Sequence, residues 1–177
     1  MNLIDFVKVY NTPDTDALYQ HLQNTMHHRG EWTDNAGNIT GYQNLSTADM
    51  SMEYRDQVNQ WAIDTSNKYC QDFNITLTQC SPIRVNRYDT GDHMDEHPDH
   101  IYSLFDGTVK GIPVISMVGF VNDDYKGGEF VFNLGDREEK FKLKAGEVLV
   151  FPSAFPWRHR VDPVTQGTRF TWVSWAW

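Results

Sequence analysis

The sequence predicts a mostly β protein, an antiparallel sandwich or barrel that is braced by helices at its N-terminal end. From about residue 83 onward, short segments of alternating apolar and polar residues follow one another, and turn residues such as Gly127-Gly128 separate them. Many short alternating strands between turns are typical of sandwiches and barrels. Before residue 80, apolar residues instead recur every three or four positions, which indicates helices with one face against a core.

Six segments of the C-terminal part are predicted strands, because they are short, rich in β-branched and aromatic residues, and mostly alternating. They are residues 83–88, 114–121, 129–133, 139–143, 148–151 and 168–175. No repeat, low-complexity tract or linker interrupts the chain, so we expect one domain over residues 1–177. Within it we expect a helical support region over 1–80 and a β-rich core over 81–177.

The N-terminal part is predicted to hold an edge strand, two helices and a long loop. Residues 4–10 alternate roughly and indicate the strand. Pro13-Asp14-Thr15 is a helix-start signal, and apolar residues at helical spacing follow it. The second helix has a clear apolar stripe, made of Met50, Tyr54, Val58, Trp61, Thr65 and Tyr69. Residues 28–46 are rich in Gly, Asn, Asp and Thr, and they indicate a loop with short strand pieces.

Composition and charge argue against several classes of partner. The chain has a formal net charge of -9, whereas binding to nucleic acid calls for clustered Lys and Arg, so a nucleic-acid partner is not expected. The start of the chain lacks the pattern of a secretory signal, and no run approaches the roughly 18 apolar residues of a membrane span. We therefore expect a cytoplasmic protein without a membrane partner. Cys70 and Cys80 have no metal-ligand spacing, and we expect two reduced, partly buried thiols.

The most specific chemical signal is a pair of ligand types two residues apart, His97 and Asp99. Alternate residues of an extended segment point to the same side, so both side chains can reach one metal ion. A third ligand must come from elsewhere, and His159, the one histidine after residue 100, follows a hydrophobic strand that can place it at a barrel mouth. Two histidines and one carboxylate on one side of a metal, with the other positions open, is the arrangement of non-haem Fe(II) oxygenases.

Other interpretations of these histidines stay open. A histidine and an aspartate two residues apart are commonly just a solvated surface pair. His93 and His97 have the spacing of a helical zinc site, but Gly91 and Pro98 disfavour a helix there. We therefore expect His93 and His100 to be exposed or to lie beside the ligands without binding the metal.

A wider set of residues accompanies the three candidate ligands. Its members are Arg87, Tyr88, Gly91, Met94, His97, Asp99, Val121, Asn122, Tyr125, Gly127, Gly128, Glu129, Gly146, Phe151, Pro152, His159, Val161, Pro163, Val164, Gly167 and Arg169. Each piece is common, but the combination is specific, and over about residues 83–175 it resembles the prolyl 4-hydroxylase branch of the 2-oxoglutarate- and Fe(II)-dependent dioxygenases.

That resemblance implies both a fold and a set of site residues. The implied fold is a double-stranded β-helix (jelly roll), with residues 81–177 as the catalytic core. His97, Asp99 and His159 are implied as iron ligands, and Arg169, ten residues beyond His159, is implied to hold the distal carboxylate of 2-oxoglutarate.

Arg169 and its neighbours are the expected cofactor site. A buried dicarboxylate needs a paired cation, and a guanidinium offers two parallel donors; the alternative for Arg169 is a surface salt bridge. Tyr88 is a candidate phenolic donor to the cosubstrate, or else a core tyrosine, and Thr171 offers a hydroxyl on the face of Arg169. Trp175, on that same face, matches a family position that lines the substrate mouth. Glu129 follows a glycine turn and is a second substrate-lining candidate, although a tight turn alone explains the glycines.

The resemblance implies an enzyme that hydroxylates a C–H bond, in the nearest case that of a prolyl residue in a peptide or protein, with release of succinate and CO2. The implied cofactors are Fe(II), 2-oxoglutarate and O2, with ascorbate as reductant. The chain departs from the pattern, because Met94 replaces an aromatic residue and residues 110–115 contain no arginine. A free amino acid or another small molecule is therefore the alternative substrate. Relatives that repair nucleic acids carry a second arginine where this chain has Trp175, which argues against that activity.

Two interpretations outside this chemistry remain at the level of sequence. The first is a non-catalytic jelly-roll binding module, which predicts no iron-dependent turnover. The second is a cupin-like metalloprotein that works without 2-oxoglutarate. Such a protein needs no buried cation beyond its last ligand, so a buried Arg169 would favour the 2-oxoglutarate-dependent chemistry over this one. The oligomeric state is not determined by any of these patterns.

Overall fold

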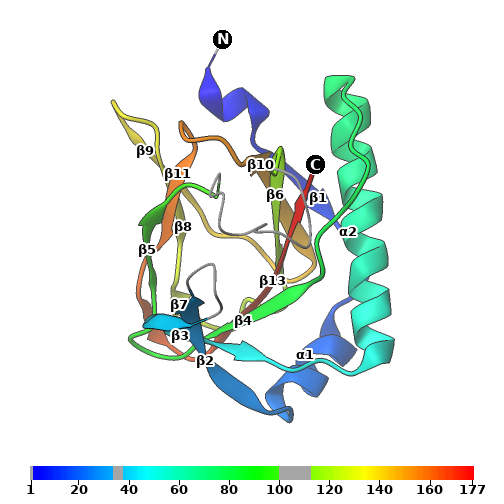
Figure 1. Cartoon of the computed structure of the whole chain (residues 1–177). Coiled ribbons are helices and arrows are strands. Elements are labelled where there is room, and N and C mark those ends of the chain that lie inside the picture. Colours follow the sequence, from blue (N-terminus) through cyan, green and yellow to red (C-terminus); the bar gives the residue numbers. More distant parts are fainter. Residues whose placement is uncertain (1, 34–37, 100–112) are drawn as a thin grey trace.

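Two antiparallel β-sheets facing each other form the body of the molecule in the computed structural model, which describes residues 2–33, 38–99 and 113–177 (Figure 1). The larger sheet has the order β1 (Lys8–Asn11), β10 (Glu147–Pro152), β6 (Ile115–Phe120), β13 (Arg169–Ala176), β4 (Arg84–Tyr88), β3 (Ile39–Ala48) and β2 (His27–Thr33). The smaller sheet has the order β5 (Met94–His97), β11 (Arg158–Val161), β8 (Phe130–Asn133) and β9 (Glu138–Phe141). A two-stranded pair, β12 (Val164–Gln166) with β7 (Lys126–Gly127), closes one end.

Aromatic and branched side chains from both sheets fill the space between them. Phe130 and Phe132 of β8 meet Phe151 of β10, with ring centroids 5.5 and 5.0 Å apart. These rings belong to a buried cluster that also includes Phe120 and Val161. Burial of this apolar area is the main force that holds one sheet on the other. The expectation of an antiparallel sandwich is thereby confirmed.

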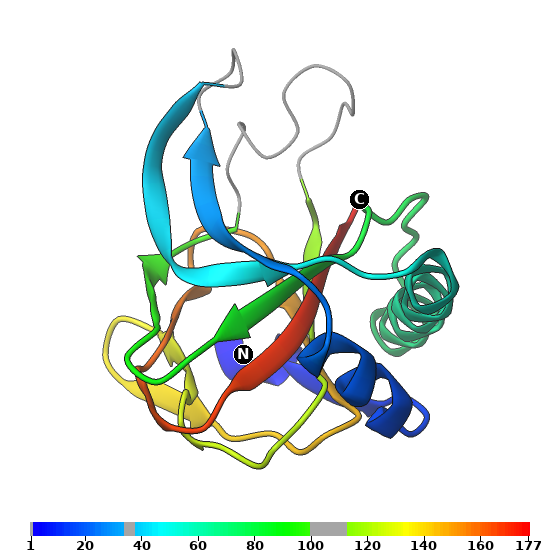
Figure 2. The ribbon, with the colours of Figure 1, turned by 90° about the horizontal axis from the view of Figure 1, so that it is seen from below.

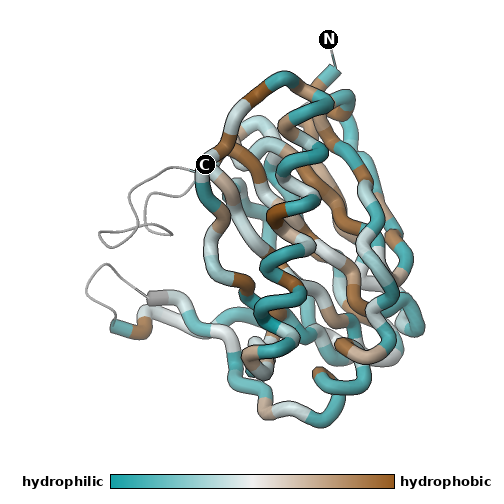
Figure 3. The backbone as a smooth tube through the Cα atoms, turned by 90° about the vertical axis from the view of Figure 1, so that its right-hand side faces the viewer, coloured by the Kyte–Doolittle hydropathy of each residue, from teal (hydrophilic) through white to brown (hydrophobic). Residues whose placement is uncertain are grey.

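Helices cover the outer face of the larger sheet. They are the 3-10 turn η1 (Leu3–Phe6), α1 (Asp16–Gln23) and α2 (Met52–Phe73). Val58, Trp61 and Tyr69 of α2 lie in one buried cluster with Phe170 and Trp172 of β13. The side of α2 that faces the viewer in Figure 3 is mostly hydrophilic, as expected of a helix with one face on a core. Because helices cover one face of β13 and the smaller sheet the other, seven of its eight residues are buried.

The predicted loop over residues 28–46 is wrong. These residues form most of a long hairpin, β2 with β3, and β3 continues into the larger sheet by pairing Ser46 with Arg87 of β4. Figure 2 shows the hairpin extending well beyond the rest of the sheet. Most of its residues are exposed or half-buried, so no apolar alternation marked it in the sequence. Residues 1–80 thus supply strands β1, β2 and β3 as well as the helices.

The other element predictions agree with the structure to within a few residues, except that the strand predicted over residues 4–10 is wrong in its first half, where Leu3–Phe6 form the 3-10 turn η1 and β1 begins only at Lys8. The predicted apolar stripe lies on α2 from Tyr54 to Tyr69, while Met50 precedes the helix, and Asn74 caps the C-terminal end in the left-handed conformation with φ of 50°. Cys70 and Cys80 are unbonded and half-buried. No helix in the described part of the chain is long and apolar enough to cross a bilayer.

Candidate metal centre and cofactor cavity

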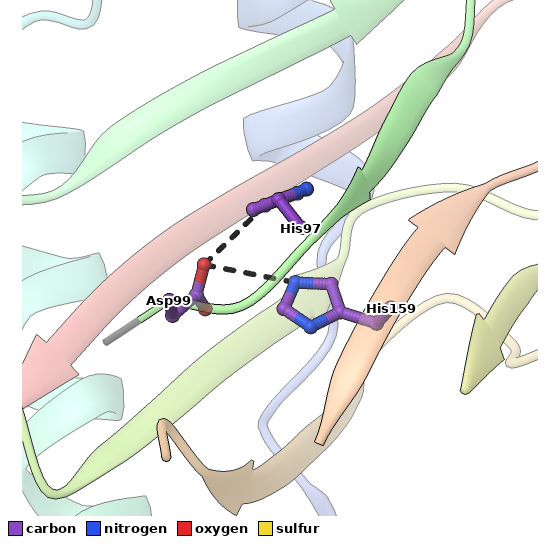
Figure 4. A group of neighbouring side chains, drawn as sticks. All are labelled: His97, Asp99 and His159. Atoms are coloured by element: carbon purple, nitrogen blue, oxygen red, sulfur yellow. Dashed lines mark ion pairs between the residues drawn. The ribbon is translucent and has the colours of Figure 1, made fainter. Parts of the chain in front are cut away.

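Two strands of the smaller sheet bring the candidate metal ligands together. His97, the last residue of β5, is the antiparallel partner of His159 on β11, and Asp99 lies two residues beyond His97 (Figure 4). Asp99 Oδ1 is 3.4 Å from His97 Nε2 and 3.6 Å from His159 Nε2. One ligand atom of each residue lies within 4.8 Å of the other two. As expected from their two-residue spacing, the side chains of His97 and Asp99 reach the same point.

The hydrogen bonds of the two imidazoles direct the same nitrogen of each ring toward this point. His97 Nδ1 is 2.8 Å from the Asp95 carbonyl oxygen, and His159 Nδ1 is 3.0 Å from the Trp157 carbonyl oxygen. A carbonyl oxygen only accepts, so each Nδ1 carries the proton and donates it. Each Nε2 therefore keeps a free lone pair, which is the tautomer that a metal ligand requires.

The charges of the three groups are strongly coupled. Burial raises the pKa of the Asp99 carboxyl, but the adjacent His159 and His97 outweigh that effect and hold it well below its usual range. Burial lowers the pKa of the His159 imidazole. Burial also acts to lower the pKa of His97, but its hydrogen bond and charge interaction with Asp99 outweigh this and raise it. Asp99 is therefore ionised, as a metal ligand must be, and a cation that binds here would displace any proton that the ion pair holds on His97 Nε2.

Aromatic packing fixes the ring of His159. It stacks on Phe130 with centroids 4.9 Å apart and planes 17° from parallel, and Phe151 contacts it edge-on at 4.9 Å. Only 4% of His159 is exposed. A ligand held in this way does not need to be ordered when a metal binds, so less binding free energy is lost.

The three side chains fit a divalent metal. Metal–ligand bonds of about 2.1 Å at right angles place ligand atoms about 3 Å apart, close to the separations between Asp99 and the two imidazoles. Nitrogen and oxygen donors from two histidines and one carboxylate suit Fe(II) and leave other coordination positions for small ligands. His97, Asp99 and His159 form the one such group of three or more ligand-type residues among those the structure describes.

Arg169 is a buried cation without a carboxylate partner in the described part of the chain. Its exposed fraction is 0%, and its guanidinium lies 4.9 Å from the ring centre of Tyr88 and 4.8 Å from that of Phe120. Nη1 donates a long hydrogen bond of 3.5 Å to Thr171 Oγ1, while Nε and Nη2 have no partner. A buried guanidinium with unused donors is costly, so this one is suited to an anion that enters the cavity. The surface salt bridge considered for Arg169 is excluded.

A single cavity between the sheets is bounded by the metal ligands and by the proposed cofactor residues. Its walls are Trp32, Arg84, Asn86, Tyr88, Met94, His97, Asp99, Met117, Val118, Phe130, His159, Val161, Arg169, Thr171, Val173 and Trp175. The phenol of Tyr88 has a raised pKa because of burial, an effect that the nearby Arg169 opposes, so it remains a neutral donor. Tyr88, Thr171 and Trp175 therefore lie where sequence reasoning placed them, on the same cavity as Arg169.

Other candidates lie elsewhere. Glu129 is half-buried next to β8 and is not among the residues that line the cavity. His93 contacts Asn44 at 3.2 Å and Asp95 at 3.5 Å and is not a member of the ligand group, so the helical zinc site is wrong. His100 and residues 110–112 lie outside the described residues.

Sequence reasoning missed several cavity residues. Phe130 holds the ring of His159, and its signal was only that of an ordinary strand residue. Arg84 and Asn86 precede Tyr88 at intervals of two, so alternation from Tyr88 could have placed them on the cavity face.

Gly128 shows why the glycine turn is needed. Its φ is +67°, and a Cβ there would lie 3.0 Å from Arg169 Cδ and 3.1 Å from Val164 Cγ2. The turn therefore allows the backbone to approach the stem of Arg169, and a side chain at this position would press on it. This supports the structural interpretation of the glycine pair.

The family model of the 2OG-Fe(II) oxygenase superfamily matches residues 83–177, which is more than half of the chain. The chain belongs to this superfamily, a class of enzymes that use Fe(II), 2-oxoglutarate and O2. The segment matched contains all three candidate ligands and Arg169. The dioxygenase class expected from the sequence, its three cofactors and the jelly-roll fold are confirmed, while a role for ascorbate stays a prediction.

Several PKHD-type hydroxylases are similar in sequence. One from Thermosynechococcus vestitus is 27% identical over 98% of this chain and 77% of its own length. One from Gluconobacter oxydans is 30% identical over 83% of this chain and 66% of its own length, and one from Rippkaea orientalis is 37% identical over 52% and 41%. Most of these matches thus leave a third or more of the relative uncovered.

Solved structures share the fold. A prolyl hydroxylase from Trichoplax adhaerens, in complex with a peptide of the hypoxia inducible factor oxygen degradation domain, superposes with a TM-score of 0.74 at 15% identity, covering 97% of this chain and 83% of that one. A Pseudomonas putida prolyl-4-hydroxylase gives a TM-score of 0.65 at 16% identity, covering 98% and 96%. At this level of identity, the similarity establishes the architecture.

Proposed function

We propose that this chain hydroxylates a C–H bond of a prolyl residue in a peptide or protein. The overall reaction converts the substrate C–H, 2-oxoglutarate and O2 into C–OH, succinate and CO2. The names of the sequence relatives and of the structural neighbours support the hydroxylase class and prolyl substrate. The observation that carries the proposal is the buried Arg169, whose unpaired donors line the same cavity as the His97–Asp99–His159 group.

The candidate ligands and the residues around Arg169 then have separate roles. His97, Asp99 and His159 would hold the iron, and Arg169 would bind the distal carboxylate of 2-oxoglutarate through its unused N–H groups. Thr171, which already contacts Arg169, would orient the guanidinium or donate to the same carboxylate.

The remaining walls of the cavity protect the reaction. Iron with bound 2-oxoglutarate supplies an oxidant for unactivated C–H bonds, so the protein need not provide a general base. Met117, Val118, Phe130, Val161 and Val173 form an apolar wall, which excludes water and strengthens electrostatic contacts inside. Tyr88 offers a phenolic hydrogen-bond donor, and Trp175 would lie beside the substrate.

The same proposal gives the N-terminal and C-terminal parts of the chain different roles. Residues 81–177 contain every proposed ligand of iron and 2-oxoglutarate, whereas residues 1–80 cover the larger sheet with helices and extend it with three strands. We infer one catalytic domain in which the N-terminal part is a structural support.

Succinate release from 2-oxoglutarate is the direct test. The full chain would be assayed with Fe(II), with and without ascorbate, against proline-containing peptides, free amino acids and no substrate. We expect turnover that a prolyl peptide stimulates and that His97→Ala abolishes, and mass spectrometry should show a gain of one oxygen on the peptide. Stimulation by free amino acids alone would contradict the peptide substrate. Absence of any turnover, together with no binding of metal or 2-oxoglutarate, would favour the non-catalytic binding module.

A further inference from the structure

The cavity holds a second arginine, Arg84, that the cofactor roles leave unused. Arg84 lies on β4 four residues before Tyr88, so both side chains are on the cavity face of the larger sheet. In the β4–β13 ladder, Tyr88 pairs with Arg169 and Arg84 pairs with Val173. Four residues of strand span about 13 Å. Arg84 therefore lies about that far from the Tyr88–Arg169 pair on the same wall of the cavity, in the direction of Trp175.

The guanidinium of Arg84 is incompletely satisfied. Nη2 donates to Gln43 Oε1, and Gln43 is itself 3% exposed and packed against Gly30 of the β2–β3 hairpin. Nε is enclosed and has no hydrogen-bond partner in the described part of the chain. Burial lowers the pKa of the Arg84 guanidinium, and no carboxylate among the described residues contributes to this pKa. A partly enclosed cation next to one neutral amide lacks the counter-charge that such groups normally have.

Arg87 on the same strand shows the contrast. It points to the opposite face of the sheet, where its guanidinium pairs with Asp89 at 3.0 Å. The sequence therefore supplies a carboxylate for the arginine that faces away from the cavity. For the arginine that faces into it, the described residues supply none.

Two neighbouring side chains have unused polar atoms as well. Trp175 Nε1 and Asn86 Oδ1 are buried without a partner among the described residues, and both residues line the cavity. Trp175 lies two residues beyond Val173, the ladder partner of Arg84, and Asn86 lies two residues after Arg84. This wall thus offers two N–H donors, from Arg84 and Trp175, and one acceptor. The oxygens of a carboxylate are acceptors only and complement the two donors.

We propose that Arg84 binds a carboxylate of the substrate, so that the enzyme selects a residue that carries a free carboxylate. This inference rests on the hydroxylase activity of the proposed function and specifies the substrate chemistry as a free carboxylate, carried either by the C-terminal residue of a peptide or by a free amino acid, the alternative substrate that the sequence left open. Arg169 and Arg84 then divide the cavity, since the first binds the cosubstrate carboxylate and the second the substrate carboxylate.

Matched pairs of acids and amides test this directly. The full chain would be loaded with Mn(II) and 2-oxoglutarate, which allows binding without turnover, and dissociation constants would be measured by calorimetry. The probes are N-acetyl-L-proline and its amide, L-proline and its amide, and the same pairs for a small panel of other amino acids. We expect at least one acid to bind about tenfold or more tightly than its amide, because a hydrogen bond to a charged group is worth more than one to a neutral group.

Variants assign that preference to Arg84. Arg84→Gln should remove the preference for the acid while leaving the affinity for the amide nearly unchanged, and Arg84→Lys should retain part of it, since the charge remains without the planar fork. Arg87→Gln is the matched control, because it removes an arginine from the same strand but from the other face, and it should keep the full preference.

Each outcome is informative. Equal affinity for acids and amides in the unaltered protein, or a preference that survives in Arg84→Gln, overturns the carboxylate subsite. Since the first comparison needs no variant, it holds even where Arg84→Gln does not fold. If neither metal nor 2-oxoglutarate binds at all, the proposed function fails and this inference fails with it. Tighter binding of L-proline than of N-acetyl-L-proline would identify a free amino acid as the source of the carboxylate, and the reverse order would identify a peptide C-terminus.

Discussion

His97 and His159 lie directly opposite each other in the β5–β11 ladder, with ring centroids 4.5 Å apart and planes inclined by 58°. One pair of strands therefore sets the separation of two of the three candidate metal ligands. The third, Asp99, follows His97 by two residues and closes the group from the same chain segment. The site is thus assembled by strand pairing and does not depend on a metal to bring its ligands together.

Removing the carboxylate of this group should abolish metal binding. We expect Asp99→Ala to weaken the affinity for Fe(II) or Mn(II) by more than about 100-fold, since loss of even an outer partner of a ligand costs about 10- to 100-fold. Calorimetry with Mn(II) measures the effect. His93→Ala is the control, because His93 lies close in sequence but outside the ligand group. The Mn(II) affinity of this variant should match that of the unaltered protein. Retention of normal affinity in Asp99→Ala would exclude Asp99 as a ligand.

Replacement of Arg169 should act on the cosubstrate and not on the metal. Arg169→Gln should reduce 2-oxoglutarate affinity by about 3–5 kcal/mol, because it leaves a buried carboxylate unpaired. The 2-oxoglutarate affinity of Arg169→Lys should fall between those of the unaltered protein and of Arg169→Gln, since lysine keeps the charge but not the bidentate geometry. Titration of each Mn(II)-loaded protein with 2-oxoglutarate measures these three affinities. The Mn(II) affinities of the three proteins should agree. Unchanged 2-oxoglutarate affinity in Arg169→Gln would contradict the assignment.

The contact between Gly119 and Trp172 should be sensitive to a single added carbon. The two residues are partners in the β6–β13 ladder, and a Cβ at Gly119 would lie 2.0 Å from Trp172 Cε2. We expect Gly119→Ala to lower the free energy of unfolding by about 1–3 kcal/mol or more, because the buried indole must shift. Urea denaturation followed by tryptophan fluorescence measures it. Gly41→Ala is the control, since its nearest contact is an ordinary 3.8 Å, and a similar loss there would contradict the steric explanation.

Acid should weaken the ion pairs around Asp162. Burial acts to raise the pKa of the Asp162 carboxyl, but Lys140 and Arg160, both within 2.9 Å, outweigh it and lower the pKa. A lowered pKa in the folded state means that Asp162 stabilises the fold above the unfolded-state pKa of about 3.9, and that this contribution is lost as the pH falls through the folded-state pKa.

The variant Asp162→Asn tests that sign. At pH 7 it should lower the free energy of unfolding by about 1 kcal/mol or less, as is usual for ion pairs near the surface, and the difference should vanish in strong acid. Urea denaturation across this pH range gives the comparison. Asp136→Asn, at an exposed position, is the control and should show little difference at pH 7. A difference that grows as the pH falls would show that the pairing does not stabilise the fold.

Local pattern was sufficient for much of the fold and for the central chemistry. Alternation marked β4, β6, β8, β9, β10 and β13, because one face of each packs toward the core and selects apolar residues, but it did not mark the short strands β5 and β11, which carry His97 and His159. The spacing of His97 and Asp99 and the distance from His159 to Arg169 pointed to three side chains that the structure brings together and to a buried arginine on the same cavity. These signals are local in sequence, and side-chain direction along a strand follows from local geometry.

Tertiary structure decided the rest. The β2–β3 hairpin leaves the core and so has no apolar face to mark it, and only the pairing of β3 with β4 places it in the sheet. Alternation places Arg84 and Arg87 on opposite faces, but it does not say which face borders a cavity or which charge finds a partner. Those facts depend on strands far apart in the chain, because strand order and register are set by long-range packing that no single segment contains.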